Sequence, residues 1–550
     1  MSQSQSQSDY VIVGAGSAGC VLAARLSEDP SARVCLLEAG GPDSRREVRI
    51  PAAFSRLFRT PVDWAFETEP EPTLGGRRLY WPRGKMLGGS GSMNAMIYMR
   101  GNRRDYDGWR DAGNAGWGYD DVLPYFTRSE HQERGASAYH GVDGPLNVAD
   151  LRCVNPLSAA FVAAGVERGM PRNDDFNGPE QDGVGLYQVT QKGGRRWSAA
   201  DAYLRPALRR PNLEVRTGAQ ATRLVVEGGR AAAVEYVADG RRWRVDAARE
   251  VILAAGAIGS PHLLLLSGIG PADELRALDV PVVLDLRGVG RHLQDHPAVG
   301  VAHACTRPIT LAGAEQFRHL ARYLALKQGP LTSNVAEAGA FCRTDPAAAS
   351  PDLQFHFGPT FFTTEGRGGP REHGFSFGAT LIRPRSAGRI TLRTRDPLAP
   401  PAIQANYLAD EADVRVLAAG VELARELADT RAFDPYRGAE VSPGPEVRSR
   451  AGIEAFLRRA VETLYHPAGS CRMGSDELAV VDPTLRVRGV DGLRVVDASV
   501  MPEIVGGNTN APTIMIAERA ADLIRGRGAP AARRPVADGA APGPGAGAVV

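Results

Sequence analysis

Apolar and polar positions near the N-terminus follow a pattern that predicts a strand, a helix and a second strand. Residues 10–13 form a short apolar run, and RVCLLE is a second such run that ends in Glu38. Between them, AGCVLAARLSE has helical periodicity, with Val21, Leu22 and Leu26 on one side. The two periods together predict a β-α-β unit at the start of the folded chain.

Later apolar stretches predict further buried elements. VILAAGAIGSPHLLLLSGIG, residues 251–270, contains Gly, Ser, Pro and His. It therefore indicates a buried strand, a turn and a helix rather than a membrane span. DLQFHFG and GRITLRT have the composition of strands. No internal repeat is present.

Composition narrows the class of protein. The chain has 550 residues and a formal net charge of +2, with no long basic run. This length predicts more than one lobe, and the charge balance disfavours nucleic acid as a partner. The six cysteines form no CxxC pair, which favours a reducing compartment over a disulfide framework. The polar N-terminus lacks the apolar segment of a signal peptide, so a cytoplasmic protein is expected. Residues 1–8 and the Ala/Pro/Gly-rich tail 526–550 are predicted to be disordered.

Glycines lie between the first strand and the helix in G-x-G-x-x-G spacing. Gly14 permits a tight turn, Gly16 lets the backbone approach a pyrophosphate, and Gly19 lets helix and strand pack closely. The helix N-terminus would face the phosphates, and Glu38 would accept hydrogen bonds from an adenosine ribose. The acid disfavours NADP, while NAD and FAD both remain open on this motif.

A second glycine-rich segment is WPRGKMLGGSGSMNAMIYMRG, residues 81–101. Gly84, Gly88, Gly89 and Gly91 crowd a stretch that ends in an apolar run. Such glycines indicate backbone that passes very near a ligand. The alternative, a flexible surface loop, fits less well, because the apolar residues that follow would then be exposed.

The stretch YHPAGSCRMG holds His466 in a loop of small residues. His292 and His296 in RHLQDHP have the i, i+4 spacing of a metal pair, but no third ligand is near in the sequence, so no metal site is predicted. Cys471 follows His466 by five residues, and a thiol–imidazole pair there would leave the glycine motifs unexplained.

Taken together, these motifs resemble those of the glucose–methanol–choline (GMC) family of FAD-dependent oxidoreductases. Residues 81–101 and 251–270, RPRSAGRITLRTRDPLAPPAIQANYL (383–408), YHPAGSCRMG and LRVVDASVMPEIVGGNTNAPTIMIAERAADLI (493–524) are similar to the family's motifs and occur in its order. The similarity runs from about residue 9 to 525. Within the family, the choline dehydrogenase and aliphatic or polyglycol alcohol dehydrogenase branch is the most similar.

This resemblance implies an α/β fold with two lobes. A Rossmann-like FAD-binding domain would be assembled from the separated segments 9–155, 195–300 and 460–525. A second, α+β substrate domain, built on an antiparallel sheet, would come from 156–194 and 301–459.

The resemblance also assigns residues to FAD. It implies that the N-terminal motif holds the pyrophosphate and ribose, that the second glycine segment passes the isoalloxazine ring, and that the last motif meets the ribityl chain and pyrimidine. Thr222 is expected near the adenine. The cofactor-binding residues expected in this way are Gly14, Gly16, Ser17, Ala18, Gly19, Glu38, Ala39, Arg83, Leu87, Gly88, Asn94, Ala95, Thr222, Asp497, Ala498, Pro512 and Thr513.

The catalytic residues that the resemblance implies are His466 as general base and Asn510 as its hydrogen-bonding partner. A neutral imidazole suits the removal of a hydroxyl proton near neutral pH, while FAD accepts the hydride. Some family members link FAD covalently through a His in the second segment. This chain has Met93 there, so non-covalent FAD is expected.

The expected activity is FAD-dependent oxidation of an alcohol to an aldehyde or ketone, with a small-molecule alcohol as substrate and a quinone or another acceptor for the electrons. An oxidase that uses oxygen, a flavin-containing hydroxynitrile lyase and a non-catalytic flavoprotein are the alternatives. His356, in LQFHFG, is a candidate to line the substrate cavity, although a buried core histidine is the favoured interpretation. Glu337 is a second candidate, and a carboxylate there would attract a cation such as choline. No transmembrane segment is predicted, and peripheral association with the inner membrane stays open.

Overall fold

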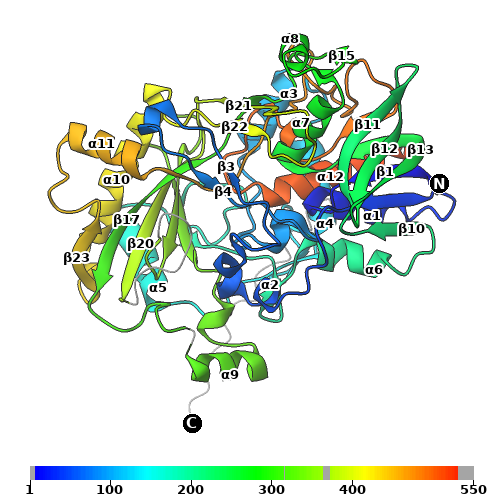
Figure 1. Ribbon diagram of the computed structural model, residues 1–550. Helices are drawn as coiled ribbons and strands as arrows, with labels where there is room; N and C mark the ends of the chain where they lie inside the picture. Colours follow the sequence, from blue (N-terminus) through cyan, green and yellow to red (C-terminus); the bar gives the residue numbers. More distant parts are fainter. Residues whose placement is uncertain (1–5, 315, 363–371, 531–550) are drawn as a thin grey trace.

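Two seven-stranded sheets organise the part of the chain that the computed structural model describes, namely residues 6–314, 316–362 and 372–530. Figure 1 shows them on opposite sides of the molecule, with the N-terminus beside the first sheet. Segments that are far apart in the sequence contribute to each of them.

The first sheet has the order β10-β2-β1-β13-β12-β11, and β25 also pairs with β13. Its strands are β1 (Ser6–Val13), β2 (Val34–Leu37), β10 (Leu213–Arg216), β11 (Gln220–Glu227), β12 (Arg230–Ala238), β13 (Arg241–Leu253) and β25 (Leu493–Val495). Strands β10, β2, β1, β13 and β25 run parallel, while β12 and β11 form an antiparallel extension. The central stretches of this sheet, residues 10–13, 34–37 and 251–253, are apolar and buried, as expected for a sheet that is covered on both faces. Strand β10 at the edge is partly exposed and carries Glu214 and Arg216.

Four helices lie beside this sheet (Figure 1). Helix α1 (Ser17–Leu26) follows β1 and packs against α12 (Asn510–Ile524), which in turn contacts α4 (Tyr119–Ser129). The β1-α1-β2 unit is the one that the N-terminal pattern predicts. Helix α7 (Gly256–Leu266) follows β13, in agreement with the strand, turn and helix expected for 251–270.

The N-terminal boundary differs from the prediction. Residues 1–8 were expected to be disordered, yet Ser6–Ser8 pair with Val245–Ala247 as the first part of β1. Polar side chains are tolerated there because β13 supplies the backbone partners. Residues 1–5 of that segment lie outside the described residues. So do residues 531–550 of the tail, whereas 526–530 are described as turn and irregular backbone.

The second sheet is antiparallel throughout, with the order β23-β17-β20-β19-β18-β7 and β24 paired to β17. Its strands are β7 (Gly183–Leu186), β17 (Pro297–Cys305), β18 (Ala338–Cys342), β19 (Leu353–Gly358), β20 (Gly374–Leu381), β23 (Arg437–Ser442) and β24 (Glu462–Thr463). Helices α5 (Pro156–Glu167) and α10 (Glu411–Ala428) pack on it, next to α11 (Arg450–Ala460). Because β17 and β24 contain residues 297–300 and 462–463, this sheet extends past the lobe boundaries predicted at 300 and 460.

Side chains of the central strands alternate between two environments. In β19, Phe355 and Phe357 pack on Phe161 of α5, with 4.8 Å between the ring centroids of Phe161 and Phe357. His356, between them, points to the opposite face and lines a cavity. This two-residue period lets one strand serve a packed aromatic core and a binding site at once.

The remaining elements are short. GRITLRT contains β21 (Gly388–Thr391), which joins β16 (Arg291–Leu293) and β22 (Ala402–Gln404) in a separate three-stranded sheet. The others include α2 (Arg46–Arg49), η1 (Pro51–Leu57), α3 (Arg103–Asp111), α6 (Arg205–Ala207), α8 (Ala272–Arg276), α9 (Phe317–Leu326), η5 (Pro330–Thr332) and η7 (Ala498–Val500). Among the described residues, no helix has both the length and the apolar character needed to cross a membrane.

Packing at Gly19 yields a first prediction. A Cβ atom at Gly19 would lie 1.8 Å from the carbonyl oxygen of Gly14, whereas one at Gly108 in α3 would meet nothing within 4 Å. We expect Gly19→Ala to lower the free energy of unfolding by about 1–3 kcal/mol, since α1 must shift away from β1. Gly108→Ala is the matched control and should be neutral or stabilising by up to about 1 kcal/mol. Urea unfolding of both variants tests this, and equal midpoints would contradict it.

Candidate active site

One cavity of about 1110 Å³ extends from the first sheet to the second. Its first wall is formed where parallel strands end, at Val13 of β1, Leu37 of β2, and Ala254 and Asp497, which follow β13 and β25. Carboxyl ends of neighbouring parallel strands are the usual ligand-binding edge of an α/β sheet. The volume exceeds that of an ordinary single-ligand pocket, so a cofactor and a substrate can share it.

Glycines bring two loops into direct contact beside this edge. Gly14 has φ of +99°, and a Cβ there would lie 2.6 Å from the carbonyl oxygen of Ala254. The second glycine segment presses on the same turn, because a Cβ at Gly89 would lie 2.8 Å from Cα of Gly16. Gly88 donates its amide to the carbonyl of Ala15 at 2.7 Å. Only residues without side chains fit such an arrangement, which leaves backbone amides exposed to the cavity.

Two helix N-termini face the cavity from this side. Helix α1 begins after Gly16 and α12 begins at Asn510, and neither has a side chain that caps its first amides. The hydroxyl of Ser17 donates to Oδ1 of Asn510 at 2.7 Å, which ties the two helix starts together. Uncapped helix N-termini are suited to bind phosphate groups.

Two buried carboxylates sit at the ends of β2 and β25. Glu38 accepts from the amides of Ala15 and Gly40, both at 2.8 Å. Burial raises the pKa of Glu38 to about 7, against the lowering effect of these amides. Asp497 accepts from the amide of Gly256 at 2.9 Å and from the hydroxyl of Ser260, and burial raises its pKa as well. Both carboxyl groups line the cavity and keep lone pairs for a ligand.

The loop that carries His466 is held by the segment just before β17. Gln294 and Ala468 exchange backbone hydrogen bonds at 3.0 and 2.9 Å, and the amide of Leu464 donates to the carbonyl of His296 at 2.9 Å. The side chain of Asp295 accepts from the amide of His466 at 2.7 Å. Segments about 170 residues apart in the sequence are thus paired at the junction of the two sheets.

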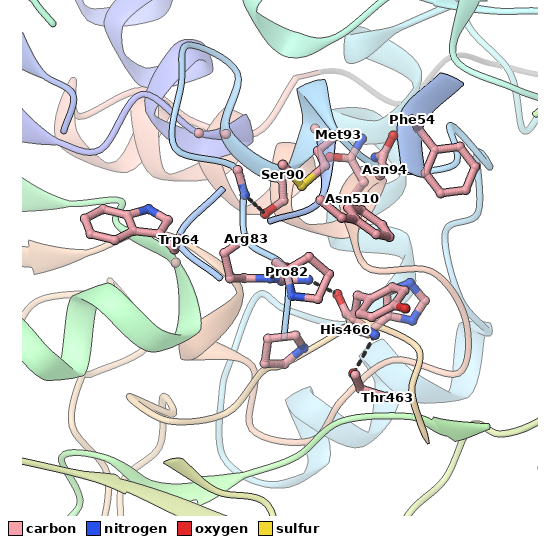
Figure 2. A pocket seen from close by; sticks show the side chains of 18 of the residues that line it. Phe54, Trp64, Pro82, Arg83, Ser90, Met93, Asn94, Thr463, His466 and Asn510 are labelled. Carbon is pink, nitrogen blue, oxygen red and sulfur yellow. Dashed lines mark hydrogen bonds between the residues drawn. The ribbon is translucent and has the colours of Figure 1, made fainter. Parts of the chain in front are cut away.

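Tyr465 adopts φ of +68°, which is uncommon for a bulky residue. Its amide donates to the hydroxyl of Thr463 at 2.7 Å, and its carbonyl accepts from the guanidinium of Arg83. Pro467 restricts the conformation of His466 on the other side. These contacts hold a strained backbone that aims the imidazole into the cavity, where Figure 2 shows it near Arg83, Met93 and Asn510.

The imidazole of His466 has a partner at each nitrogen. Its Nδ1 lies 3.0 Å from Nδ1 of His296, and its Nε2 lies 3.3 Å from Nδ2 of Asn508. Gln354 donates to Oδ1 of Asn508 at 3.2 Å, so the amide nitrogen of Asn508 is the atom that faces His466. Because an amide nitrogen can only donate, Nε2 of His466 must be unprotonated and Nδ1 must carry the proton. His296 then accepts at Nδ1.

Electrostatics keep this imidazole neutral. Burial lowers the pKa of His466 well below its usual range, and nearby His296, His356 and Arg83 lower it further. Burial likewise lowers the pKa of His296 to about 3 and that of His356 to about 4. At neutral pH the site therefore presents an uncharged imidazole.

The structure differs from the prediction at the partner of His466. Asn510 was expected there, but its Oδ1 accepts from Ser17, whereas Asn508 contacts His466. The two asparagines are separated by one residue, and α12 begins at the second. Asn510 thus lies at the helix start beside the glycine turn, and Asn508 lies in the preceding loop beside the imidazole.

Most predicted cofactor residues line the cavity. Those in contact with it are Gly14, Gly16, Ser17, Ala18, Glu38, Ala39, Arg83, Asn94, Ala95, Asp497, Ala498 and Thr513. Five others lie behind the wall, namely Gly19, Leu87, Gly88, Thr222 and Pro512. The hydroxyl of Thr222 donates to the carbonyl of Glu235 at 3.2 Å, so Ala219 and Ala221 line the cavity in its place. The outward direction of Thr222 depends on the register of β11, which residue type does not reveal.

The contacts of Glu337, His292 and His296 decide the remaining sequence-based hypotheses, a substrate-binding carboxylate and a metal pair. Glu337 does not face the cavity, because its carboxylate accepts from Ser158, Ser333 and the amide of Asn155 at 2.6–2.8 Å. It holds the start of α5 instead. His292 lies 3.3 Å from Glu503 and His296 contacts His466, so the two histidines of RHLQDHP point to different partners. Within the described ranges, no group of three or more His, Cys, Asp or Glu residues could hold a metal ion.

The far wall of the cavity comes from the second sheet and its loops, together with the end of the second glycine segment. It is mostly apolar and includes Met96, Ile97, Val299, Val335, Phe361 and Phe362, with His356 and Thr380 as polar members. This wall lies on the side of His466 and Asn508, whereas the glycine turn and the two carboxylates lie at the opposite end. The site thus has one end suited to a dinucleotide and one suited to a small, largely apolar molecule.

Comparison with known proteins places these features in a family. Models of the GMC oxidoreductase family match residues 8–298 and 384–517. An alcohol dehydrogenase (acceptor) from Pseudomonas putida is 46% identical over 94% of this chain and 95% of its own. The mitochondrial choline dehydrogenase of Homo sapiens is 46% identical, over 96% of this chain and 91% of its own length. An oxygen-dependent choline dehydrogenase of Brucella anthropi is 45% identical, over 95% of this chain and 96% of its own length.

Solved structures of similar proteins agree with this family assignment. Pyridoxine 4-oxidase from Mesorbium loti is 35% identical, with a TM-score of 0.85 over 94% of this chain and 98% of its own. A formate oxidase from Aspergillus oryzae RIB40 is 26% identical, with a TM-score of 0.90 over 96% and 99%. The chain belongs to the GMC oxidoreductase family and is an FAD-dependent oxidoreductase.

Proposed function

We propose that this enzyme oxidises a neutral alcohol with an apolar chain to the aldehyde or ketone, with His466 as the general base. The observation that carries the proposal is the pair formed by Nε2 of His466 and Nδ2 of Asn508, 3.3 Å apart and inside the same cavity as the glycine turn. An unprotonated ring nitrogen beside an amide donor is suited to a hydroxyl group that must lose its proton.

The end of the cavity at the first sheet fits FAD. Amides around Gly14 and Gly16 and the start of α1 would hold the pyrophosphate, Glu38 the ribose, and Arg83, Asn94 and Ala95 the flavin end. The sequence has no histidine from residue 79 to 130, and Met93 lines the cavity, so the cofactor would be held without a covalent bond. When bound, FAD supplies the acceptor for the hydride that leaves the alcohol carbon.

Proton removal falls to His466. Its Nε2 takes the hydroxyl proton, while Nδ1 keeps its own proton in the hydrogen bond to His296. His296 acts as a positioning residue, because an acceptor at Nδ1 fixes the tautomer and the ring plane of the base. The lowered pKa of His466 means that no proton has to be removed from the base before the reaction.

Asn508 takes the role that the sequence assigned to Asn510. Its amide, oriented by Gln354, donates toward the same space as Nε2 of His466 and would stabilise negative charge that develops on the substrate oxygen. Asn510 instead supports the cofactor end through Ser17.

The charges around the cavity favour a neutral substrate over a cation. Its acidic members within the described residues are Glu38, Glu462 and Asp497. Glu38 and Asp497 lie at the cofactor end, and Glu462 pairs with Arg77 at 2.5 Å. Arg83 adds positive charge beside His466. A trimethylammonium group would therefore meet no carboxylate at the base. Choline stays the comparison substrate, because relatives that are 45–46% identical to this chain carry its name.

Anaerobic spectroscopy tests the activity. We expect the flavin absorbance of the purified enzyme to bleach with aliphatic or aromatic primary alcohols, and more slowly with choline. His466→Ala should keep its yellow colour and reduce the flavin at least about a hundred-fold more slowly, since a positioned base is removed. His131→Ala on the surface is the control.

Each outcome has a distinct meaning. Full-speed bleaching in His466→Ala would overturn the role of His466. Faster bleaching by choline would overturn only the neutral substrate. Cleavage of a cyanohydrin without any bleaching would favour a lyase. After bleaching, the rate at which air restores the colour separates an oxidase from a dehydrogenase that needs a quinone or another acceptor.

The two asparagines give a second test. Asn508→Ala should lower the rate of flavin reduction by about 10²–10³-fold with FAD content unchanged, because it removes a donor at the reacting oxygen. Asn510→Ala should mainly lower the FAD content of the purified protein. Stopped-flow reduction and the ratio of flavin to protein absorbance measure both, and the reverse pattern would restore the assignment to Asn510.

The buried imidazoles predict how stability depends on pH. In the folded enzyme, burial lowers the pKa of His296 to about 3 and that of His356 to about 4, so both rings stay neutral when the pH falls below about 6. In the unfolded chain the same rings bind protons near their ordinary pKa of about 6.5. The unfolded state then binds more protons, so stability should fall as pH drops from about 6.5 towards 4, by up to about 1.4 kcal/mol per pH unit for each ring.

Thermal unfolding of the FAD-bound enzyme between about pH 7 and pH 5 measures this slope. His356→Gln should make the slope shallower. A slope that His356→Gln shares with the wild type would show that the His356 ring does not stay neutral in the folded state.

A further inference from the structure

The most exposed large apolar side chains of the described residues gather on one short helix. Phe317 is 83% exposed, Leu324 61% and Leu326 59%, and all three belong to α9. Single exposed leucines are ordinary on protein surfaces, but three within ten residues are a cluster. Figure 1 shows α9 at the bottom of the molecule, projecting beyond the second sheet.

One face of α9 is anchored and the other is left in solvent. Tyr323 is buried and donates its hydroxyl to the carbonyl of Arg49 at 3.0 Å, and half-buried Leu320 packs with Tyr323, Ala314 and Leu331. Phe317, Ala321 and Leu324 are exposed and follow the i, i+4, i+7 spacing of a single stripe, whereas Leu326, in the last turn, lies outside it. Because the inner face already fixes the helix, the outer stripe is not needed for packing.

Cations flank this stripe. Arg318 and Arg322 are exposed one helical turn apart. Lys327 follows the helix, is half-buried, and donates to the carbonyls of Tyr323 and Leu324 at 3.1 and 2.7 Å. The sequence has no Asp or Glu from residue 316 to 336. Among the described residues, none of the three cations forms an ion pair. The outer face is therefore apolar in its centre and positive at its margin.

This combination identifies the partner by its chemistry. An anionic bilayer accepts apolar side chains at the boundary of its acyl chains, while flexible Arg and Lys side chains reach the phosphate groups. A second copy of the chain fits less well, because a symmetric contact would bring Arg318 and Arg322 near their own copies. We propose that the outer face of α9 docks the enzyme on an anionic lipid surface.

The position of α9 suggests what this docking does for the enzyme, and this part of the inference rests on the proposed function. Leu320 and Leu331, beneath the helix, also line the large cavity, so α9 forms part of its rim. Docking would hold the cavity against the bilayer, where apolar alcohols and lipid-soluble electron acceptors are concentrated. The docking itself depends only on the surface of α9.

Vesicle sedimentation with the full-length, FAD-bound protein tests the proposal. The probes are vesicles of mixed phosphatidylglycerol and phosphatidylcholine, compared with pure phosphatidylcholine. We expect the wild type to sediment with the anionic vesicles and to be released in part by added salt. F317S/L324S should lower the partition coefficient at least about tenfold, or about 1.4 kcal/mol. R318Q/R322Q should remove the preference for anionic lipid.

The matched control is L208S/L478S, which changes two leucines of 48% and 47% exposure on other elements and should bind like the wild type. F317S/L324S should keep its flavin absorbance and its turnover with a water-soluble dye, because neither side chain lines the cavity. Failure of turnover in the wild type would count against the proposed function and leave the binding result intact.

Three results would overturn the docking. The wild type could stay in the supernatant with both kinds of vesicle. F317S/L324S could bind as tightly as the wild type. Light scattering could show a wild-type oligomer that F317S/L324S dissociates, in which case the stripe is a contact between copies of the chain.

Discussion

The pairing of residues 294–296 with 464–468 is the constraint on which the site depends. It joins the start of the second sheet to the loop after β24, and thereby sets the distance between the two sheets at the point where His466 enters the cavity. Asp295 is central to it. Its buried carboxylate accepts from the amide of His466 and from the hydroxyls of Thr463 and Tyr407. A buried carboxylate needs such partners, so the same bonds that satisfy Asp295 also fix the backbone of His466.

The electrostatic character of the site follows from this arrangement. His296, His356 and His466 lie close together with Arg83 and have no carboxylate partner to charge them. Burial keeps all three rings neutral, and repulsion from neighbouring cationic groups adds to this effect for His296 and His466. Because both rings are neutral, the hydrogen bond between Nδ1 of His466 and Nδ1 of His296 fixes the tautomer of each ring and leaves both uncharged. At the opposite end, amides and helix starts offer positive potential, which suits phosphate groups.

Sequence was most informative where chemistry depends on backbone shape. G-x-G-x-x-G predicted β1, α1 and β2, and the family motifs led to the loop of His466 and to most residues of the first cavity wall. The sequence was least informative where the direction in which a side chain points decides its role. Asn508 and Asn510 are the same residue type in N-T-N, and only the start of α12 distinguishes them. Thr222 and Glu337 failed for similar reasons, since strand register and buried hydroxyl partners turn them from the cavity. His296 carried no signal as a partner of His466, because their contact joins distant segments.

The alternation along β19 and β20 has a consequence for how this enzyme can diversify. Phe355, Phe357, Phe375 and Phe377 form the aromatic core with α5 and α10, while His356, Gly378 and Thr380 face the cavity. Positions that shape the substrate space are therefore interleaved with, but separate from, positions that hold the lobe together. Replacing every second residue can reshape the chamber without removing an aromatic ring from the core, so a lineage can explore new alcohols at little risk to folding.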